Sequence, residues 1–460
     1  MRLKCELRFL RPSLKTIWML GFVLLVTSLP GWIPDAEAIP AFARKYQVNC
    51  NVCHVRWPRL NPFGERFLEN GYQMPGTHDG GVVGKVRLGD VTLDDVSNYI
   101  GFLFDVEPVT NSSLRKDVQG AEDQIELANV SILRMFTAGT LTENVGFLMD
   151  MTSLFSQSSE FNLGRAFVSF NNLGGMNWGH LRIGRIDPSS YFSFATDRPQ
   201  LFPTSPKIGP PFGAFGPSIQ RWGQAFGSAT ASKFYGIFDR NMAPIFPFAP
   251  TLYNADVDAG IDLHGRPFGD WFLYQVGVLN GGGERWGDTN NSKDWYVMTR
   301  LDYAQSDDFS ANLSGFAYFG NHNAKVLGGA DVSRSRYGVG ARIRYRWLDL
   351  SGAYTIDRIS DLPSGMSATF DATATGVTVD AHAIVTDRLL LGMGYNHMDA
   401  GGVLSERKSA SFLSLQARYY LRSNIALQVR NEVNLRDAEG GASPARNLRN
   451  QFITNIAIAF

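Results

Sequence analysis

Two cysteines and a histidine lie within five consecutive residues, Cys50-Asn51-Val52-Cys53-His54, which form a C-x-x-C-H motif. This spacing can place both thiols on one side of a short helical turn, where each can form a thioether with a vinyl group of haem. His54 is then in position to bind the haem iron through a ring nitrogen. The motif predicts one covalent haem c, held by Cys50 and Cys53 and ligated by His54.

Two other kinds of site could use the same cysteines. A zinc site needs four ligands, and His78 is the only further histidine near the motif, so zinc is the weaker alternative. A redox dithiol or a structural disulfide needs only Cys50 and Cys53, and it is the better alternative to haem attachment.

The motif leaves the sixth ligand of the iron open. Met74 is the candidate distal ligand, because it is the only methionine close to the motif and a thioether ligand raises the reduction potential of haem. His78 or a side chain from elsewhere in the chain could take this place instead. Met74 could also simply pack in an apolar core.

The beginning of the chain has the pattern of a secretory signal. Five Lys and Arg residues precede an apolar stretch from Ile17 to Leu29, and Ala36-Glu37-Ala38 is a small-x-small cleavage site. The apolar stretch is too short for a membrane-spanning helix. We expect residues 1–38 to be a secretory signal peptide, with a permanent N-terminal anchor as the alternative.

Cysteine usage and charge agree with export. Of the three cysteines, Cys5 belongs to the expected signal, so the other two are both in the motif and no disulfide framework is expected. Lys and Arg together number 43, as do Asp and Glu. This balance gives no electrostatic reason to expect a nucleic-acid partner.

We expect residues 39–84 to form a small monohaem cytochrome c-like segment and a linker. Phe63, Phe67 and Leu68 recur at helical spacing before Asn70-Gly71, which is typical of the end of a helix. The segment's aromatic residues could surround a haem or be buried against a neighbouring surface. The arginines that could bind the haem propionates are Arg44, Arg56 and Arg59.

From about residue 85 the chain alternates apolar and polar residues. One such stretch has Tyr337, Val339 and Ile343 on one face and Arg342 and Arg344 on the other. Alternation alone would also suit a soluble sandwich. Three further features favour a membrane barrel: connections that alternate between short and long, Trp and Tyr at the edges of the apolar faces, and a final strand that ends on an aromatic residue.

We therefore expect residues 85–460 to form an all-β transmembrane barrel of 16–18 antiparallel strands behind a small N-terminal α-helical c-type haem domain. The count of eighteen includes a strand pair around a turn near Ala229–Lys233, and sixteen remain if one weak pair is loop. An even strand number with short periplasmic turns places both the N- and C-termini on the periplasmic side of the outer membrane. We expect the haem segment to plug the lumen.

The long connections offer no recognisable metal site. Several of their carboxylates could hold a ferrous ion briefly, but their spacing matches no known ligand pattern, so no iron-binding or catalytic residue is assigned. These carboxylates are Glu284, Asp288, Asp361 and Glu406. The opposing charges of Arg342 and Asp262 in the lumen could pair with each other, or they could hold the haem segment.

Residues 39–72 resemble the fused monohaem cytochrome-porins of bacterial outer membranes. The motifs that carry the resemblance are Ile39-Pro40-Ala41-Phe42-Ala43-Arg44, the C-x-x-C-H motif, Pro58-Arg59-Leu60-Asn61-Pro62-Phe63-Gly64 and Asn70-Gly71-Tyr72. This family is best known as the ferrous-iron oxidases of iron-oxidising bacteria. The resemblance implies that Cys50 and Cys53 are the thioether positions and that His54 is the proximal ligand.

The resemblance further implies that the chain is an outer-membrane electron conduit, and we expect iron(II) oxidase activity from it. Such a protein takes electrons from an extracellular donor, ferrous iron by resemblance, and passes them to a periplasmic c-type cytochrome or another carrier, with outer-membrane lipid around the barrel. The alternative is a porin or transport barrel that the haem-bearing segment plugs or gates. A membrane scaffold with no haem is the third reading.

Overall fold

The computed structural model describes most of the chain from residue 41 onwards, and residues 39–460 form one compact unit. The described ranges are 41–56, 59–75, 86–88, 91–93, 95–114, 124–153, 161–188, 190–193, 258–281, 291–306, 308–324, 330–363, 369–401, 408–435 and 448–460. Several predictions lie outside them: the signal peptide, residues 76–84 with His78, the turn near Ala229–Lys233, and the carboxylates of Glu284, Asp288 and Glu406. Asp361, expected in a long connection, is instead part of a strand that ends at Pro363.

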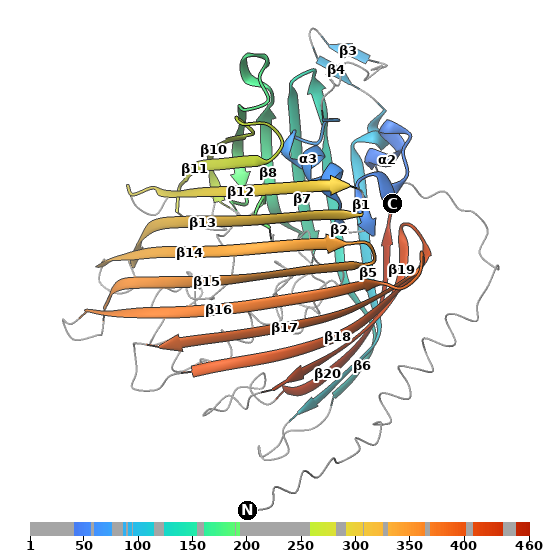
Figure 1. Ribbon diagram of the computed structural model, residues 1–460, viewed down its shortest axis with the longest axis vertical. Helices are drawn as coiled ribbons and strands as arrows, with labels where there is room; N and C mark the ends of the chain where they lie inside the picture. The colour runs from blue at the N-terminus through green and yellow to red at the C-terminus, as the bar shows by residue number, and fades with distance from the viewer. Residues whose placement is uncertain are drawn as a thin grey trace, which may run out of the picture. The chain divides into compact units, whose positions relative to one another are not determined.

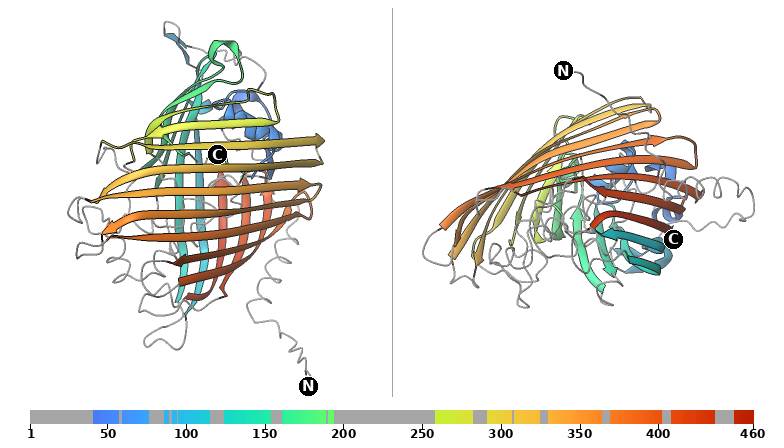
Figure 2. Two further views of the ribbon diagram at one scale, coloured as in Figure 1. Left: turned by 60° about the vertical axis from the view of Figure 1, so that its left-hand side comes forward. Right: turned by 90° about the horizontal axis from the view of Figure 1, so that it is seen from below.

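Sixteen antiparallel strands pair into one closed barrel (Figures 1 and 2). They are β5 (Ile100–Leu114), β6 (Gln124–Thr142), β7 (Val145–Ser153), β8 (Phe161–Phe170), β9 (His180–Ile186), β10 (Asp258–Gly265), β11 (Phe272–Leu279), β12 (Asp294–Ser306), β13 (Phe309–Ala324), β14 (Ala330–Tyr345), β15 (Leu348–Pro363), β16 (Thr369–Ile384), β17 (Leu389–Gly401), β18 (Lys408–Arg422), β19 (Ile425–Asn434) and β20 (Leu448–Ala459). The predicted all-β barrel is confirmed. Because β9 pairs directly with β10 and β20 with β5, the strand number is at the lower end of the expected range.

The two rims of the barrel differ in their connections. Seven connections at one end, here called the short-turn rim, join consecutive strands through residues 143–144, 171–179, 266–271, 307–308, 346–347, 385–388 and 423–424. The opposite end, the long-loop rim, includes the connection over residues 187–257. The first strand begins and the last strand ends at the short-turn rim, where Phe102 and Phe460 exchange backbone hydrogen bonds of 2.7 and 2.9 Å.

Side chains alternate across the barrel wall as the sequence predicts. On β14, Val339 and Ile343 are about half exposed on the outer face, whereas Arg336 is buried on the inner face. The last strand follows the same rule, since Ala457 and Ala459 are buried and Phe460 is exposed. Large exposed aromatic side chains gather at the short-turn rim, as in the interfacial girdles of membrane barrels. They are Phe170, Trp178, Phe268, Trp271, Tyr303, Tyr345, Trp347 and Phe460.

The N-terminal segment is folded from short elements. They are α2 (Ala41–Tyr46), the 3-10 turn η1 (Cys50–Val52), the paired strands β1 (His54–Arg56) and β2 (Arg59–Leu60), and α3 (Pro62–Glu69). A two-stranded sheet of β3 (Val86–Leu88) and β4 (Val91–Leu93) and the 3-10 turn η2 (Val96–Asn98) follow this segment in sequence and precede the barrel. A third 3-10 turn, η3 (Leu173–Gly175), lies at the short-turn rim. In the described part of the chain, no helix has the length and apolarity to cross a membrane.

The predicted helix and its stop are confirmed in α3. The side chain of Asn61 accepts a hydrogen bond from the Gly64 backbone N–H at 2.8 Å, and Pro62 occupies the first helical turn, so the helix begins there. At the other end Gly71 has a φ of 62°, and the Tyr72 N–H bonds to the Phe67 carbonyl at 2.9 Å. This geometry is a Schellman motif, which needs a residue that tolerates the left-handed region.

The N-terminal segment lies on the inner face of the barrel wall at the short-turn rim. Its side chains contact Arg300 and Arg342, whose sequence neighbours Leu301 and Ile343 are exposed on the outer face. Because side chains alternate between the two faces of a strand, Arg300 and Arg342 point into the barrel. The expectation that the segment plugs the lumen agrees with these contacts.

Aromatic packing joins α2 to α3 and both helices to the barrel. Phe42 stacks on Tyr72 with ring centroids 5.5 Å apart and meets Phe67 edge-on at 5.1 Å. Phe67 and Tyr72 are buried in one cluster with Ala138, Leu148, Phe167 and Ile186 of the barrel. Burial against a neighbouring surface, rather than contact with a haem, therefore accounts for these two aromatic side chains.

Candidate haem-binding site

The C-x-x-C-H motif folds as the sequence predicts, into a single short turn. The Cys53 N–H bonds to the Cys50 carbonyl at 3.3 Å, and neither cysteine is in a disulfide. The side chain of Asn61 donates hydrogen bonds to the carbonyls of Asn51 and Val52 at 3.2 and 2.9 Å. Asn61 therefore caps α3 and fixes the turn at the same time.

The turn and α3 approach each other closely at Gly64. A Cβ atom added at this glycine would collide with the Cys53 carbonyl oxygen and would lie 2.8 Å from its carbon. The same carbonyl accepts a hydrogen bond of 3.0 Å from the Asn61 N–H. Only a residue without a side chain fits between the helix and the motif, so the position of α3 determines the position of the turn.

A cavity of about 580 Å³ lies between the motif and the short-turn rim of the barrel. Cys50, His54 and Arg56 line it from the N-terminal segment. The barrel lines it through residues 387–388 of the β16–β17 connection and through residues 420–423, which are the end of β18 and the start of the β18–β19 connection. The volume is within the range of cavities that bind cofactor-sized molecules.

The residues around this cavity fit a covalent haem. Cys50 and His54 line it, and the wall carries the aromatic ring of Tyr420 together with cationic side chains. Cys53 is a partly exposed thiol on the same turn as Cys50, although it is not among the described residues of the lining. Thiols suit thioether bonds, a ring nitrogen suits iron, and cations suit propionates. The haem roles of Cys50, Cys53 and His54 remain predictions that this donor set supports.

Burial, with a smaller contribution from the nearby Cys50, raises the pKa of the Cys53 thiol to about 11. Desolvation disfavours the charged thiolate, so Cys53 is a neutral thiol at pH 7. Zinc coordination and disulfide exchange both use the thiolate. In the absence of a metal ion, Cys53 is therefore a slow nucleophile for disulfide exchange at pH 7.

Met74 lies elsewhere in the segment. Its side chain packs against the buried cluster that contains Phe67 and Tyr72, and its carbonyl accepts a hydrogen bond of 3.2 Å from the Asn70 amide. The described residues that line the motif cavity do not include Met74. Its role as distal ligand remains a prediction.

The three arginines considered for the haem propionates have different surroundings. Arg44 donates to the backbone carbonyls of Ser97 and Ile100 at 2.5 and 2.8 Å. Arg59 is buried and ion-paired with Asp349. Arg56 lines the motif cavity, where it forms an ion pair of 3.1 Å with an exposed carboxylate, Asp387.

Buried ion pairs hold the N-terminal segment on the inner face of the barrel. Four carboxylates and four arginines, here called the docking network, contact one another across this interface. They are Glu65, Glu69, Asp302, Asp349, Arg59, Arg266, Arg300 and Arg342. The four positive and four negative charges balance, which a buried cluster of charges requires.

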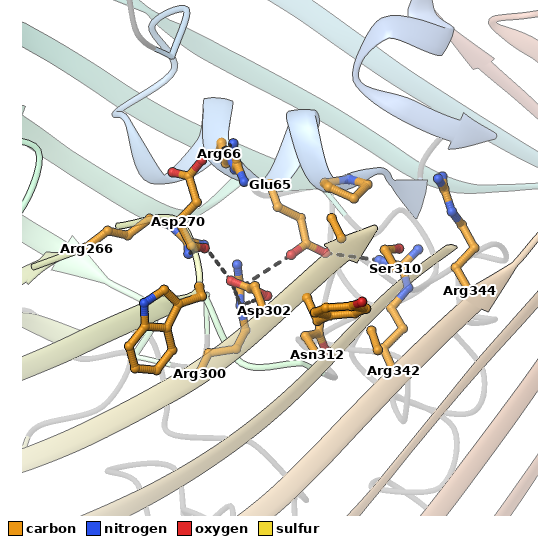
Figure 3. A pocket seen from close by; sticks show the side chains of 15 residues that line it. Glu65, Arg66, Arg266, Asp270, Arg300, Asp302, Ser310, Asn312, Arg342 and Arg344 are labelled. Carbon is orange, nitrogen blue, oxygen red and sulfur yellow. Dashed lines mark hydrogen bonds and ion pairs between the residues drawn. The ribbon is translucent and has the colours of Figure 1, made fainter. Parts of the chain in front are cut away.

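Both glutamates of α3 bridge two arginines of the barrel. Glu65 lies 3.2 Å from Arg300 and 3.0 Å from Arg342, and Figure 3 shows its carboxylate between them. Glu69 accepts from Arg266 at 2.9 Å and from Arg300 at 2.5 Å. Burial by itself lowers the pKa of Arg266, but Glu69 and Asp302 outweigh it and raise the pKa above its ordinary value. These arginines stay charged and paired.

Two histidines of the barrel that the sequence analysis did not single out also contact the segment. Arg59 donates to Nδ1 of His382 at 2.9 Å, and Nε2 of His264 lies 2.9 Å from the Glu69 carbonyl. Both histidines are at inward-facing positions of strands in which apolar and polar residues alternate, and this alternation was the sequence signal that could have identified them. Asp262 pairs with Arg182 and not with Arg342. Arg342 pairs both with Asp349 of the barrel and with Glu65 of the segment, so both roles that the sequence left open for it apply.

We expect Glu69→Gln to destabilise the docking of α3 by about 3 kcal/mol, because it removes one of the two carboxylates that Arg266 and Arg300 share and leaves the buried network with an excess positive charge. Native-state hydrogen exchange of the α3 amides measures the free energy of separating α3 from the barrel. The matched control is Arg66→Gln, because Arg66 pairs with an exposed carboxylate, Asp270. This substitution should cost less than about 1 kcal/mol. Equal effects of the two substitutions would contradict the assignment of the network.

In haem-free protein, the alkylation rate of Cys53 by iodoacetamide should keep rising as the pH passes 9 and approaches 11, because the thiolate is the reacting form. Fragment mass spectrometry distinguishes Cys53 from Cys50. A free cysteine derivative is the control, and its rate should level off above its pKa of about 8.5. A plateau at pH 9 for Cys53 would show that its thiol is not desolvated.

The barrel is similar to solved outer-membrane barrels of low sequence identity. An anion-selective porin from Comamonas acidovorans has a TM-score of 0.47 and 17% identity over 78% of this chain and 99% of that chain. OmpT of Vibrio cholerae has a TM-score of 0.46 and 11% identity over 82% and 99%, and OprB of Pseudomonas putida has 0.46 and 11% over 79% and 93%. No protein-family model and no curated protein matches the sequence.

Proposed function

We propose that this chain is an outer-membrane electron conduit, in which a porin-like barrel carries one c-type haem at its short-turn rim. The observation that carries the proposal is the motif cavity, which brings Cys50 and His54 against the barrel rim. The closed barrel, its apolar outer face and its aromatic girdle support insertion in the outer membrane. In such barrels the short turns face the periplasm.

Each part of the chain has a separate task in this proposal. A haem bound at Cys50 and Cys53 would supply a one-electron redox couple. His54 ligates its iron, α3 and the docking network hold the turn in place, and the barrel wall separates the site from lipid. Electrons come from an extracellular donor, which the resemblance implies is ferrous iron, and go to a periplasmic c-type cytochrome or a similar carrier.

The second candidate function is a porin or transport barrel that the segment plugs or gates. The observation behind this candidate is that the docking network fixes the segment as a plug against the inner face of the barrel wall. Conductance of the reconstituted protein separates the two functions. A conduit that is sealed by its segment conducts few ions in wild type, whereas a gated porin opens and closes in the presence of its ligand.

We expect protein purified from cells competent in cytochrome maturation to carry one haem per chain, as measured by the pyridine haemochrome spectrum. Cys50→Ala/Cys53→Ala should carry none. Stopped-flow mixing with ferrous iron should reduce the wild-type haem, with its absorption bands as the readout. A colourless wild-type preparation would contradict haem attachment, and a haem that no extracellular donor reduces would contradict the conduit.

Val339 tests whether the outer face of the barrel meets lipid, because its side chain is 54% exposed near the middle of β14. Val339→Arg should lower the free energy of unfolding from lipid vesicles by about 2–4 kcal/mol, the cost of a cation on the lipid face. Val339→Leu is the matched control and should change stability little. Equal stabilities of the two variants in a denaturant titration would show that this face does not contact lipid.

A further inference from the structure

The proposed function places the electron donor and the haem at opposite rims of the barrel. The donor reaches the long-loop rim from outside, whereas the C-x-x-C-H turn lies beside the short-turn rim. The apolar band of an outer-membrane barrel is about 25 Å tall. Electron tunnelling becomes steeply slower with distance, and it is faster through packed or bonded atoms than across gaps. An electron conduit therefore needs an unbroken series of packed side chains between the two rims.

Ring contacts lead from the motif into the barrel wall. Tyr46 is four residues before Cys50, and four residues span at most about 14 Å. The ring of Tyr46 meets that of Phe67 edge-on with centroids 5.7 Å apart, and Phe67 lies 6.2 Å from the ring of Tyr72. Phe67 and Tyr72 are packed in one buried cluster with Phe167 of β8. The contacts thus reach the inner face of the barrel.

Arg182 of β9 continues the series from Phe167. Its guanidinium carbon lies 5.1 Å from the centroid of the Phe167 ring and 4.6 Å from that of Tyr191. Its Nε donates to Oδ1 of Asp262 at 2.9 Å, and the hydroxyl of Tyr296 donates to Oδ2 of the same carboxylate at 2.8 Å. All five side chains are buried, so neither water nor lipid separates them.

Two tyrosines complete the series at the long-loop rim. Tyr296 of β12 and Tyr318 of β13 are directly opposite each other and share a buried cluster with Leu279. The hydroxyl of Tyr318 donates to Asp294 at 2.5 Å. Asp294 is the first residue of β12, which ends at the short-turn rim, so it lies at the long-loop rim.

The residues of this series, here called the contact row, connect the two rims through the interior of the barrel. They are Tyr46, Phe67, Tyr72, Phe167, Arg182, Asp262, Tyr296 and Tyr318. We propose that the contact row is the route by which electrons cross from the long-loop rim to the haem. This route rests on the proposed function, since it needs a haem on the motif.

The transfer along the contact row is a one-electron step. The donor loses one electron, and the ferric haem gains it and becomes ferrous. No bond forms or breaks, and the tyrosines keep their phenolic protons because they mediate tunnelling without being oxidised. Removing one ring would open a gap in the row, and the rate of transfer would fall.

The test delivers electrons at the long-loop rim of the full-length, haem-loaded protein. A ruthenium photosensitiser is attached to Asn291→Cys, an exposed position three residues before Asp294, and haem reduction after a flash is followed by absorption. Tyr296→Leu should slow this reduction by at least about tenfold, equivalent to about 1.4 kcal/mol in the barrier. Tyr296→Phe is the matched control, because it keeps the ring, and it should retain most of the rate. Tyr318→Leu is a second variant and should show the same loss.

A photosensitiser on Asp308→Cys is the control for folding and for haem potential. Asp308 is exposed in the turn between β12 and β13 at the short-turn rim, so electrons from it do not need the contact row. Their rate should be the same in wild type and in all three tyrosine variants. Haem-loaded leucine variants that accept electrons from the Asn291 position as fast as wild type would overturn the route. A wild-type protein without haem would instead overturn the proposed function, so the two failures are distinguishable.

Discussion

The buried ion pairs between α3 and the barrel are the constraint on which the rest of the structure depends. Glu65 and Glu69 lie one helical turn apart, and the barrel presents Arg300 between them. A one-residue shift of α3 would leave charges buried without partners, which costs several kcal/mol for each of them. We infer that the docking network determines the position of the segment more than it adds to stability, because desolvation offsets much of the attraction in buried ion pairs.

The position of α3 is transmitted to the motif by short contacts. Asn61 binds both the first turn of the helix and the carbonyls of the C-x-x-C-H turn, and Gly64 leaves space for the Cys53 carbonyl. At the other end of the helix, a Cβ atom at Gly71 would lie 2.6 to 2.8 Å from the side chains of Ser169 and Asn171. The barrel thus determines where His54 lies, through a helix of only eight residues.

Local patterns made much of this fold predictable, whereas contacts between distant residues were not. The stop at Asn70-Gly71, the alternation along β14 and the final strand follow from neighbouring residues, and all three are confirmed. The sequence could not show that Arg342 binds Glu65, because the two are 277 residues apart. Of the three arginines that it suggested for the propionates, Arg56 lines the motif cavity and Arg44 and Arg59 are not among the described residues of the lining. Strand number depends on which distant strands close the barrel.

The energetics of the network also bear on the choice between a conduit and a gate. A ligand can open a gate only by its difference in affinity for the closed and open states. Opening here would separate Glu65, Glu69 and Arg59 from four buried partners, Arg266, Arg300, Arg342 and Asp349. To change the ratio of open to closed molecules from 1:99 to 99:1, a ligand must bind the open state about 5.5 kcal/mol more tightly than the closed state. Several buried ion pairs in the closed state would make the required difference larger. A segment held in this way is better suited to keep a redox site at a constant position than to move in response to a solute.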